Sequence, residues 1–170
     1  MTISIITVVL NNKPYVEDCI RSVIHQSHKD LEYMIIDGGS TDGTVNAITP
    51  YERHLSKWIS EPDGGIYDAM NKGIKWASGD VIGMLNADDF YIDEGVLEKV
   101  ATVMADAYVD ACYADLVYVD RENADKVIRY WRSRSFEPGL FASGWGPAHP
   151  TFFVRKKIYD RYGIFDVNYK

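Results

Sequence analysis

Two adjacent carboxylates, Asp88 and Asp89, follow an apolar segment that is expected to form a buried strand over residues 80–85. Carboxylates this close repel each other and are costly unless water, hydrogen bonds or a cation compensate their charge. Mg²⁺ prefers carboxylate oxygen and often completes its shell with substrate phosphates. The pair therefore predicts a divalent-cation site, although Asp89 could equally cap the turn before the two aromatic residues that follow.

Polar side chains recur at the same position after three earlier apolar segments, where Asn11, Asp37, Asp42 and Asp63 stand beside glycines and turn residues. Each of them taken singly is more readily a turn or cap residue than a functional one. In a parallel sheet, however, the carboxyl ends of the strands share one edge, and ligands bind at that edge. Together these residues predict a ligand site that contains a cation.

The elements that must position these residues alternate along the first half of the chain. β-branched apolar runs predict buried strands, and stripes of 3.6-residue period predict helices between them. We expect a helix opened by Pro14 and a weaker helix disturbed by Pro50. The strands are expected over residues 3–10, 31–36, 57–60 and 80–85, with a helix over 66–77. This order predicts an α/β fold with parallel strands joined by right-handed crossovers.

Asp93 is expected to cap one more helix, after which the alternation of strands and helices stops. A loop rich in glycine, proline and aromatic residues occupies 136–150. Gly163 is expected to close the last helix at its C′ position. The other elements predicted here are a hairpin of strands 111–119 and 126–132, a strand over 151–154 and a helix over 155–162. No linker separates two domains, so residues 1–170 are expected to form one.

Composition narrows the function. The 170-residue chain has a net charge of −7 and no basic block, which argues against a nucleic-acid partner. Cys19 and Cys112 lack metal-site spacing and are expected to be core residues of a reduced protein. The chain shows no leader peptide and no apolar run of about 18 residues, so we expect a cytoplasmic protein.

The loop after the first strand excludes several nucleotide sites. A dinucleotide fold would need G-x-G-x-x-G there, but the chain has Asn11-Asn12-Lys13-Pro14. A P-loop is absent, and so is the glycine-rich basic loop of a sugar-nucleotide pyrophosphorylase. We therefore expect phosphates to be held through a metal ion.

Seven segments also match a known family in order. They are 4–11, 36–44 (similar to D-[DG]-x-S-x-D-x-T), 61–74, 77–80, 85–89 in place of D-x-D, 149–153 and 162–166. On these segments the chain resembles the GT-A-fold family 2 glycosyltransferases, inverting enzymes that build bacterial polysaccharides. Segment 61–74 is most similar to a capsule and exopolysaccharide subgroup.

The resemblance implies a GT-A fold, a Rossmann-like open mixed sheet with helices on both faces. Residues 1–92 would bind the nucleotide sugar, and 93–170 would begin an acceptor-side half that is incomplete. Val8, Leu10 and Asp37 would hold the base and ribose. The other donor-binding residues that the family implies are Asp63, Gly65, Asp68 and Asn71 on the diphosphate and sugar side, with Asp88 and Asp89 holding Mg²⁺ or Mn²⁺. Asn86 departs from the family by replacing the first acid of D-x-D, which leaves open whether Asp88 or Asp89 is the direct ligand.

The family's general base lies downstream of the 162–166 segment, so we expect it beyond Lys170 and leave the catalytic residue unknown. Asp166 matches a structural position better than a substitute base. The chain is thus expected to be a C-terminally truncated form that transfers slowly or not at all. Trp145 and His149 are acceptor-side candidates, although they could equally fix their own loop.

The resemblance further implies a UDP-linked hexose or N-acetylhexosamine donor. The acceptor would be a saccharide or a lipid-linked saccharide, which would bring the protein to the inner face of the membrane. Two alternatives remain: a non-catalytic nucleotide-sugar-binding module, and a nucleotidyltransferase, which the missing basic loop disfavours.

Overall fold

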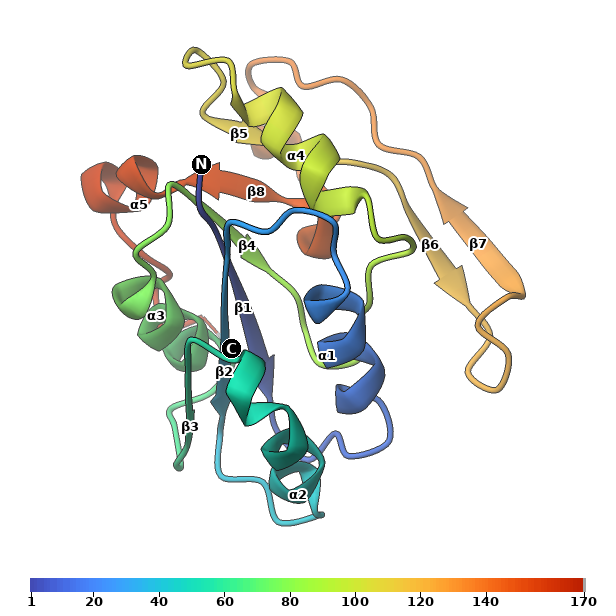
Figure 1. Ribbon diagram of the computed structural model, residues 1–170. Coiled ribbons are helices and arrows are strands. Elements are labelled where there is room, and N and C mark those ends of the chain that lie inside the picture. The colour runs from blue at the N-terminus through green and yellow to red at the C-terminus, as the bar shows by residue number, and fades with distance from the viewer. Residues whose placement is uncertain (170) are drawn as a thin grey trace.

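The computed structural model describes residues 1–169 of the chain. Its centre is a six-stranded sheet with the order β3-β2-β1-β4-β8-β5 (Figure 1). Four neighbouring strands run parallel, namely β1 (Ile3–Val9), β2 (Leu31–Asp37), β3 (Lys57–Ser60) and β4 (Val81–Met84). The predicted parallel arrangement of the first half is confirmed.

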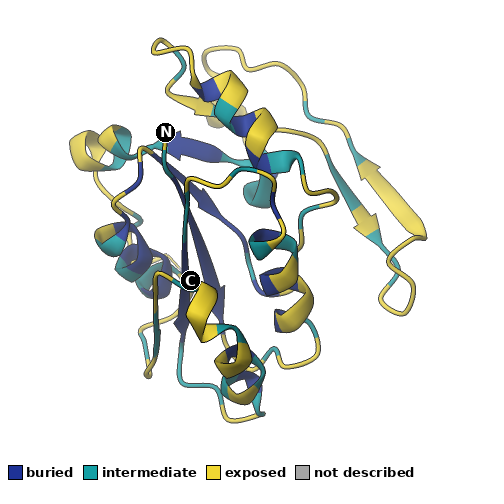
Figure 2. Ribbon diagram, in the orientation of Figure 1, coloured by how far each residue is buried: buried dark blue, intermediate teal, exposed yellow. Residues whose placement is uncertain are grey.

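Helices cover both faces of this sheet because successive side chains of a strand point to opposite sides. In β1, Ile3, Ile5 and Val9 pack toward one hydrophobic cluster, while Ile6 and Val8 pack toward another. The first cluster includes residues of α1 (Val16–Ile24), α2 (Thr44–Ile48) and α4 (Val96–Met104). The second includes residues of α3 (Ile66–Trp76) and α5 (Lys156–Tyr162). Figure 2 shows the result as a buried sheet between partly exposed helices.

The sheet is mixed, as predicted, because β8 runs antiparallel to the other five strands. Strand β8 (Phe153–Arg155) pairs antiparallel with β4 and with β5 (Ala111–Cys112). The chain therefore returns from its second half to the centre of the fold beside β4. This return places η3 (His149–Thr151), a 3₁₀ turn that directly precedes β8, next to the strand that carries the acidic pair.

The strand predicted over 111–119 is wrong, because the chain there divides between two sheets. Strand β5 joins the main sheet, whereas β6 (Leu116–Val119) pairs with β7 (Val127–Trp131) in a separate two-stranded sheet. The Ala114 carbonyl between them accepts hydrogen bonds from Ser133 Oγ (2.8 Å) and Thr151 Oγ1 (3.0 Å). Side-chain donors thus occupy the backbone that a continuous strand would need for its ladder.

Several helix boundaries also differ from the prediction. Pro14 lies in the turn before α1, and the residue that precedes α4 is Gly95. Asp93 accepts the Gly95 N–H (2.8 Å) and so shapes the approach to the helix without capping it. The predicted weak second helix is α2 followed by a 3₁₀ helix, η1 (Thr49–His54), and the aromatic loop contains η2 (Leu140–Ser143). Gly163 ends α5 at a φ of 97°, but it lies at the C-cap, one position before the predicted C′, because its N–H still donates to the Tyr159 carbonyl. None of the helices within residues 1–169 is long and apolar enough to cross a membrane.

Candidate functional site

The carboxyl ends of the four parallel strands bring the predicted polar residues to one edge of the sheet. Asp37 is the last residue of β2, and Asn11 follows β1 by two residues. Asp63 follows β3, and the acidic pair Asp88–Asp89 follows β4. Because β3, β2, β1 and β4 are neighbours in that order, these residues line a continuous edge, as the sequence predicted (Figure 1).

Asp37 is completely buried, and its carboxylate organises the loop that follows β2. Its Oδ2 accepts the backbone N–H groups of Gly39 (3.1 Å) and Ser40 (2.9 Å) and the hydroxyl of Ser60 (2.6 Å). The last of these bonds ties the end of β2 to the end of β3. Asp37 therefore stabilises the loop at this edge of the sheet, and its carboxylate oxygens are not free to bind a ligand.

The loops after β1 and β2 are joined by a second set of hydrogen bonds. Asn11 adopts a positive φ of 51°, its N–H donates to Ser40 Oγ (2.7 Å), and its Oδ1 accepts the Thr41 N–H (2.8 Å). Asp42 accepts the N–H groups of Thr44 (2.9 Å) and Lys13 (3.0 Å). The Thr44 hydroxyl and the Lys13 N–H lower the pKa of Asp42. Asp42 is thus a structural acid of the motif.

In the segment after β3, the aspartate carboxylates accept hydrogen bonds from the backbone N–H groups of neighbouring glycines. Asp63 Oδ1 accepts the Gly65 N–H (2.8 Å), and Asp68 Oδ2 accepts the Gly64 N–H (3.0 Å). The Gly64 N–H is the main cause of a lowered pKa at Asp68. Gly65 sits at a φ of 114°, which only glycine adopts readily, immediately before α3. A Cβ at Gly38 would lie 2.8 Å from Asp63 Oδ2, so the Asp63 carboxylate rests against the β2 loop.

Asn71 lies one turn further along α3 and is engaged elsewhere. Its Nδ2 donates to the Phe165 carbonyl (2.8 Å), and its Oδ1 accepts the Phe165 N–H (2.9 Å). Asn71 is buried, and both functional atoms of its amide are used by this pair of bonds. The donor contact predicted for Asn71 stays a prediction, and this geometry does not favour it.

The acidic pair after β4 differs from the other acids. No hydrogen bond or ion pair within residues 1–169 engages the carboxylate oxygens of Asp88 or Asp89. Asp88 is exposed, whereas Asp89 is partly buried. Burial, together with the negative charge of Asp88, raises the pKa of Asp89 to about 6. The site thus holds two like charges without a protein counter-charge.

Asn86 adds a third oxygen to this acidic pair. Its Oδ1 is buried and has no hydrogen-bond partner among the described residues. A buried amide oxygen without a partner is costly and points to a missing donor or cation. Amide and carboxylate oxygens are the ligands that hard divalent cations prefer, so these residues fit such an ion. Residues 1–169 contain no group of three or more His, Cys, Asp or Glu residues arranged for a metal, so a ligand from a bound phosphate would be needed to complete the shell.

A buried polar network supports the turn that carries Asn86. The Cys19 thiol of α1 donates to the Asn86 carbonyl (3.4 Å) and contacts Thr7 Oγ1 of β1 (3.6 Å). Thr7 Oγ1 in turn lies 3.1 Å from the hydroxyl of Tyr33 in β2. The sequence predicted Cys19 as a core residue, which is confirmed, but this contact across 67 residues had no local signal.

The remaining predicted residues lie on either side of the edge. Val8 is buried in the core, so only its backbone can reach a ligand, whereas the Leu10 side chain is 59% exposed. Trp145 packs against Phe141 and Tyr113, with ring centroids 5.5 and 5.6 Å apart. His149 Nε2 is buried without a partner, and burial lowers the pKa of the ring. Trp145 therefore packs against neighbouring aromatic rings, and Nε2 of His149 makes no hydrogen bond with the described protein atoms. The acceptor contacts expected for both residues stay predictions.

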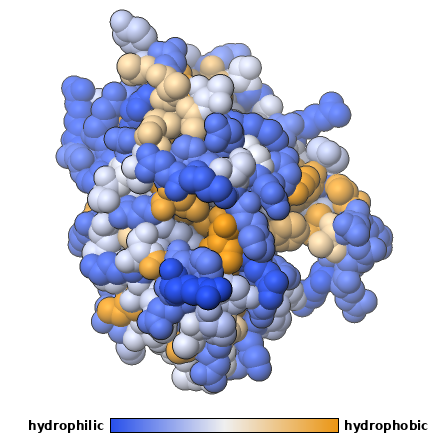
Figure 3. All heavy atoms as spheres, viewed as in Figure 1, coloured by the Kyte–Doolittle hydropathy of each residue, from blue (hydrophilic) through white to orange (hydrophobic). Residues whose placement is uncertain are grey.

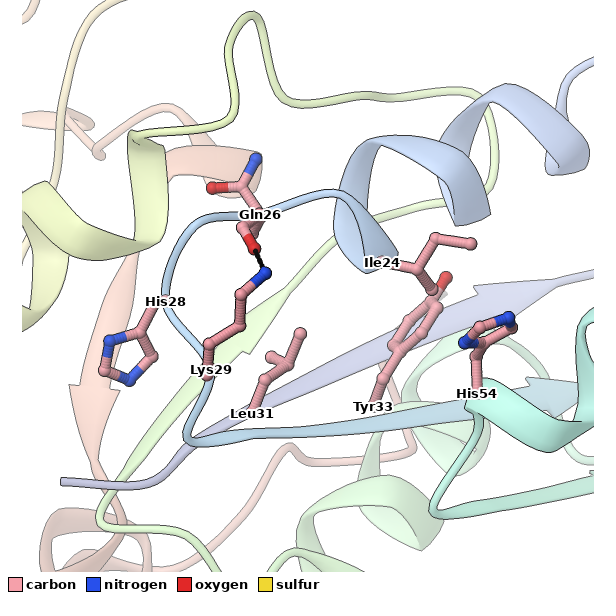
Figure 4. A pocket seen from close by; sticks show the side chains of 7 residues that line it. All are labelled: Ile24, Gln26, His28, Lys29, Leu31, Tyr33 and His54. Atoms are coloured by element: carbon pink, nitrogen blue, oxygen red, sulfur yellow. Dashed lines mark hydrogen bonds between the residues drawn. The ribbon is translucent and has the colours of Figure 1, made fainter.

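A separate hollow of about 170 Å³ lies at the opposite edge of the sheet, beside the amino end of β2 (Figure 4). Leu31 and Tyr33 of β2 form its floor, and His28, Lys29 and His54 stand around it. Lys29 is occupied by the Gln26 carbonyl, to which its Nζ donates at 3.1 Å. None of the predicted site residues lines this hollow.

Comparison with known proteins agrees with this arrangement. Residues 4–163 match the family described as glycosyl transferase family 2. An uncharacterized glycosyltransferase of Mycobacterium tuberculosis is 36% identical over 105 residues, which cover 61% of this chain and 40% of the relative. A PGL/p-HBAD biosynthesis glycosyltransferase of the same species is 28% identical over 98% of this chain and 64% of its own length. The chain thus spans only part of the curated relatives that it matches.

Solved structures share the fold. S. aureus TarS in complex with UDP-GlcNAc superposes with a TM-score of 0.72 at 18% identity, covering 95% of this chain and 47% of that protein. The mannosyltransferase PcManGT from Pyrobaculum calidifontis, in complex with GDP-Man and Mn²⁺, gives a TM-score of 0.74 at 18% identity, covering 98% and 48%. Both are GT-A glycosyltransferases, so the fold implied by the motif resemblance is confirmed.

Proposed function

We propose that this chain, which belongs to the family 2 glycosyltransferases, binds a nucleotide-diphosphate sugar through a divalent cation. The nucleotide is proposed to be UDP. The chain would take part in transferring the sugar with inversion at its anomeric carbon. The observation that carries this proposal is the set of side-chain oxygens on Asn86, Asp88 and Asp89, which have no partner in the described protein. By contrast, the acids of the neighbouring loops accept hydrogen bonds from nearby backbone N–H groups, namely Asp37, Asp42, Asp63 and Asp68.

The nucleotide would lie across the ends of β1 and β2. In this proposal the backbone at Val8 and the exposed side chain of Leu10 flank the base, and Asp37 acts by holding the loop that the ribose contacts. Asp63, Gly65 and Asp68 would line the diphosphate and sugar side. Support for a UDP donor comes from TarS, which binds UDP-GlcNAc, although PcManGT binds GDP-Man.

Mg²⁺ or Mn²⁺ would be held by Asp88 with Asp89, and the Asn86 amide would bond the ribose or a water on the ion. When bound, the ion supplies charge that stabilises a departing diphosphate. The protein holds the two carboxylates close together in a partly buried turn. The Cys19 thiol stabilises this turn by donating a hydrogen bond to the Asn86 carbonyl. Burial and the neighbouring charge of Asp88 raise the pKa of Asp89, and a bound cation would compensate both carboxylates.

Inversion requires a base that takes the acceptor's hydroxyl proton on the face opposite the leaving group. We place that base outside the described residues, because Asp166 Oδ1 already accepts the N–H (2.9 Å) and Nδ2 (2.8 Å) of Asn168. The acceptor is proposed to be a saccharide or a lipid-linked saccharide in polysaccharide assembly, reached from the cytoplasmic face of a membrane. Trp145 and His149 remain the candidates for its contacts.

Thermal-shift measurements with UDP, GDP and their sugar conjugates, with and without Mn²⁺, test the donor site. One nucleotide should stabilise the fold only when Mn²⁺ is present, by an amount set by its concentration over Kd. The Asp88→Asn variant should lose this shift and keep the melting temperature of the ligand-free protein. Asp18→Asn, which changes an exposed acid of α1, is the matched control and should keep the shift.

If no nucleotide gives a Mn²⁺-dependent shift, the donor-site proposal is wrong. Three further outcomes separate the remaining functions. Donor binding without hydrolysis or transfer would indicate a nucleotide-sugar-binding module. Release of pyrophosphate from a nucleoside triphosphate and a sugar phosphate would indicate a nucleotidyltransferase. Transfer at an ordinary enzyme rate by residues 1–170 alone would contradict the placement of the base beyond them.

A further inference from the structure

The β6–β7 hairpin stands apart from the rest of the fold. It forms its own two-stranded sheet and projects beyond α1 and α4 (Figure 1). Every residue of β7 except Trp131 is exposed, in contrast to the buried strands of the main sheet (Figure 2). Within residues 1–169, β7 pairs only with β6, so its outer edge has no strand partner. A two-stranded hairpin is at best marginally stable without further packing, which raises the question of what covers it.

The chemistry of β7 and its flank is unlike that of the rest of the chain. Residues 126–134 (Lys-Val-Ile-Arg-Tyr-Trp-Arg-Ser-Arg) contain four of the 18 basic residues and none of the 25 acidic ones. Among them Ile128 and Tyr130 are 63% and 64% exposed. Apolar atoms are visible at the hairpin among hydrophilic ones on the right of Figure 3. Segment 126–134 is therefore positive, aromatic and apolar, in a protein whose net charge is −7.

Most cations of segment 126–134 are not engaged in ion pairs with the described protein. Lys126 pairs with Asp120 (3.3 Å), but no ion pair with Arg129, Arg132 or Arg134 occurs in the described part of the chain. The Arg129 guanidinium lies over the rings of Tyr118 and Trp131, at 5.5 and 5.7 Å from their centroids. This stacking holds the charge close to apolar surface without neutralising it.

The hairpin is also placed beside the candidate site. Its turn carries Arg121, whose guanidinium lies 5.4 Å from the ring centroid of Tyr15. Tyr15 belongs to the loop between β1 and α1, at the same sheet edge as the acidic pair. A surface bound by the hairpin would therefore lie near the entrance to the proposed donor cleft.

A second copy of the chain does not suit this strand. Antiparallel pairing of two β7 edges about a twofold axis would bring two copies of segment 126–134, with four cations each, side by side. A neutral apolar partner would leave Arg132 and Arg134 without compensation. An anionic lipid surface satisfies both features, because phosphate headgroups pair with arginine while Tyr, Trp and Ile side chains enter the interfacial layer.

We propose that residues 126–134 of the β6–β7 hairpin dock the protein on an anionic membrane surface, with the arginines on the phosphates and with Ile128 and Tyr130 in the interface. The exposed aromatic residues Phe136 and Phe141, which pack on each other at 5.9 Å, follow this segment in the chain. This inference rests on the proposed function in one respect, because a lipid-linked acceptor is reached at such a surface.

Co-sedimentation with vesicles tests the inference. The probes are vesicles of phosphatidylcholine alone and vesicles of phosphatidylcholine mixed with the anionic lipid phosphatidylglycerol. The protein should bind the anionic vesicles, bind neutral ones weakly, and dissociate as salt rises. Each basic residue near a charged surface changes affinity about fivefold, so R132Q/R134Q should bind roughly 30-fold more weakly. The exposed pair R53Q/K75Q makes the same change of charge elsewhere and should bind like the parent.

A second variant, I128S/Y130S, tests the apolar part and should remove the binding that persists at high salt. Melting temperatures should change little in all these variants, because the hairpin lies outside the main sheet. The proposal is overturned if anionic vesicles are not bound, or if R132Q/R134Q binds like its control. It is also overturned if size-exclusion chromatography shows a dimer that the hairpin variants dissolve while vesicles are not bound. Nucleotide binding is measured without lipid, so the donor site and the membrane surface can fail separately.

Discussion

At the scale of single residues, the acids along the sheet edge differ in whether their oxygens are already used. Asp37, Asp42 and Asp68 accept backbone N–H groups of their own loops, so their charge is compensated inside the protein. Asp88 and Asp89 have no such donors in the described chain. A carboxylate that has donors shapes a loop, whereas a pair without donors needs a cation or water. Residue type alone does not make this distinction, because all five are aspartates.

Asn86→Asp tests whether the unpartnered amide oxygen belongs to the cation site. A third carboxylate beside the pair should lower the free energy of unfolding of the metal-free protein by about 1–3 kcal/mol through repulsion. The same change should enlarge the stabilisation by Mn²⁺, because the ion then neutralises three charges. Urea unfolding with and without Mn²⁺ measures both effects. Asn86→Ala removes the orphaned oxygen and serves as control, and equal Mn²⁺ responses in all three proteins would contradict the assignment.

His149→Gln tests the burial of the histidine in the aromatic loop. Burial holds the pKa of the folded ring below its ordinary value of 6.5. As the pH falls below 6.5, the unfolded chain gains a proton that the folded ring takes up less readily, so the free energy of unfolding decreases. His149→Gln should therefore flatten the decline of stability between about pH 7 and pH 5.

Melting temperatures across this pH range provide the measurement. His54→Gln, a change at an exposed position, should leave the slope in place. An unchanged slope in His149→Gln would show that the ring titrates equally in both states.

At the scale of elements, close contact between α3 and β1 sets the position of the 63–68 loop. Gly73 lies in the middle of α3, and a Cβ there would collide with Cγ2 of Ile6 in β1. Glycine is therefore used inside a helix, where it costs about 1 kcal/mol relative to alanine, because it lets the helix approach the sheet. The helix begins at Ile66, directly after the glycines that bind Asp63 and Asp68.

Gly73→Ala should lower the free energy of unfolding by about 1–3 kcal/mol through overpacking, in spite of the better helix propensity of alanine. Chemical denaturation measures this change. Lys75→Ala, on the exposed side of the same helix, should change stability by no more than about 0.5 kcal/mol. Stabilisation by Gly73→Ala would show that α3 does not press on Ile6.

The elements themselves were largely predictable because each depends on a local pattern. The apolar runs of β1 and β2 and the stripe of α3 are visible in consecutive residues, and their predicted limits lie within about two residues of the observed ones. The segment 111–119 was not predictable. Its division into β5 and β6 depends on Ser133 and Thr151, which reach Ala114 from 19 and 37 residues away.

At the scale of the whole molecule, a well-packed sheet with two hydrophobic clusters carries a sparsely packed hairpin. Strands β1, β2 and β4 lie between helices on both faces, whereas β7 is exposed along nearly all its length. Local stability follows burial and contact density, so these two parts should open with different free energies. The ordered site edge belongs to the first part and the proposed membrane surface to the second.

Hydrogen exchange should reveal this difference directly. Backbone amides of β6 and β7 should exchange at least about 100-fold faster than those of β1 and β2, because the hairpin can open without disturbing the core. Mass spectrometry of peptides from 116–131 and from 3–9 or 31–37 makes the comparison. Equal protection of both sets would mean that the hairpin folds as part of the main sheet.

The sequence by itself determined the parallel α/β arrangement, the gathering of Asn11, Asp37, Asp63 and Asp88 at one edge, and the family. These follow from local patterns, because the alternation of strands and helices along the chain, and the residue at which each strand ends, can be read from consecutive residues. Only the tertiary structure decided which acids keep free oxygens, that Asn71 is bound to Phe165 across 94 residues, and that Cys19 supports Asn86. It also decided that β7 stands outside the main sheet and that the cations of segment 126–134 are exposed. Hydrogen-bond partners and burial depend on distant segments that come together in the fold, and no local pattern in the chain records which segments these are.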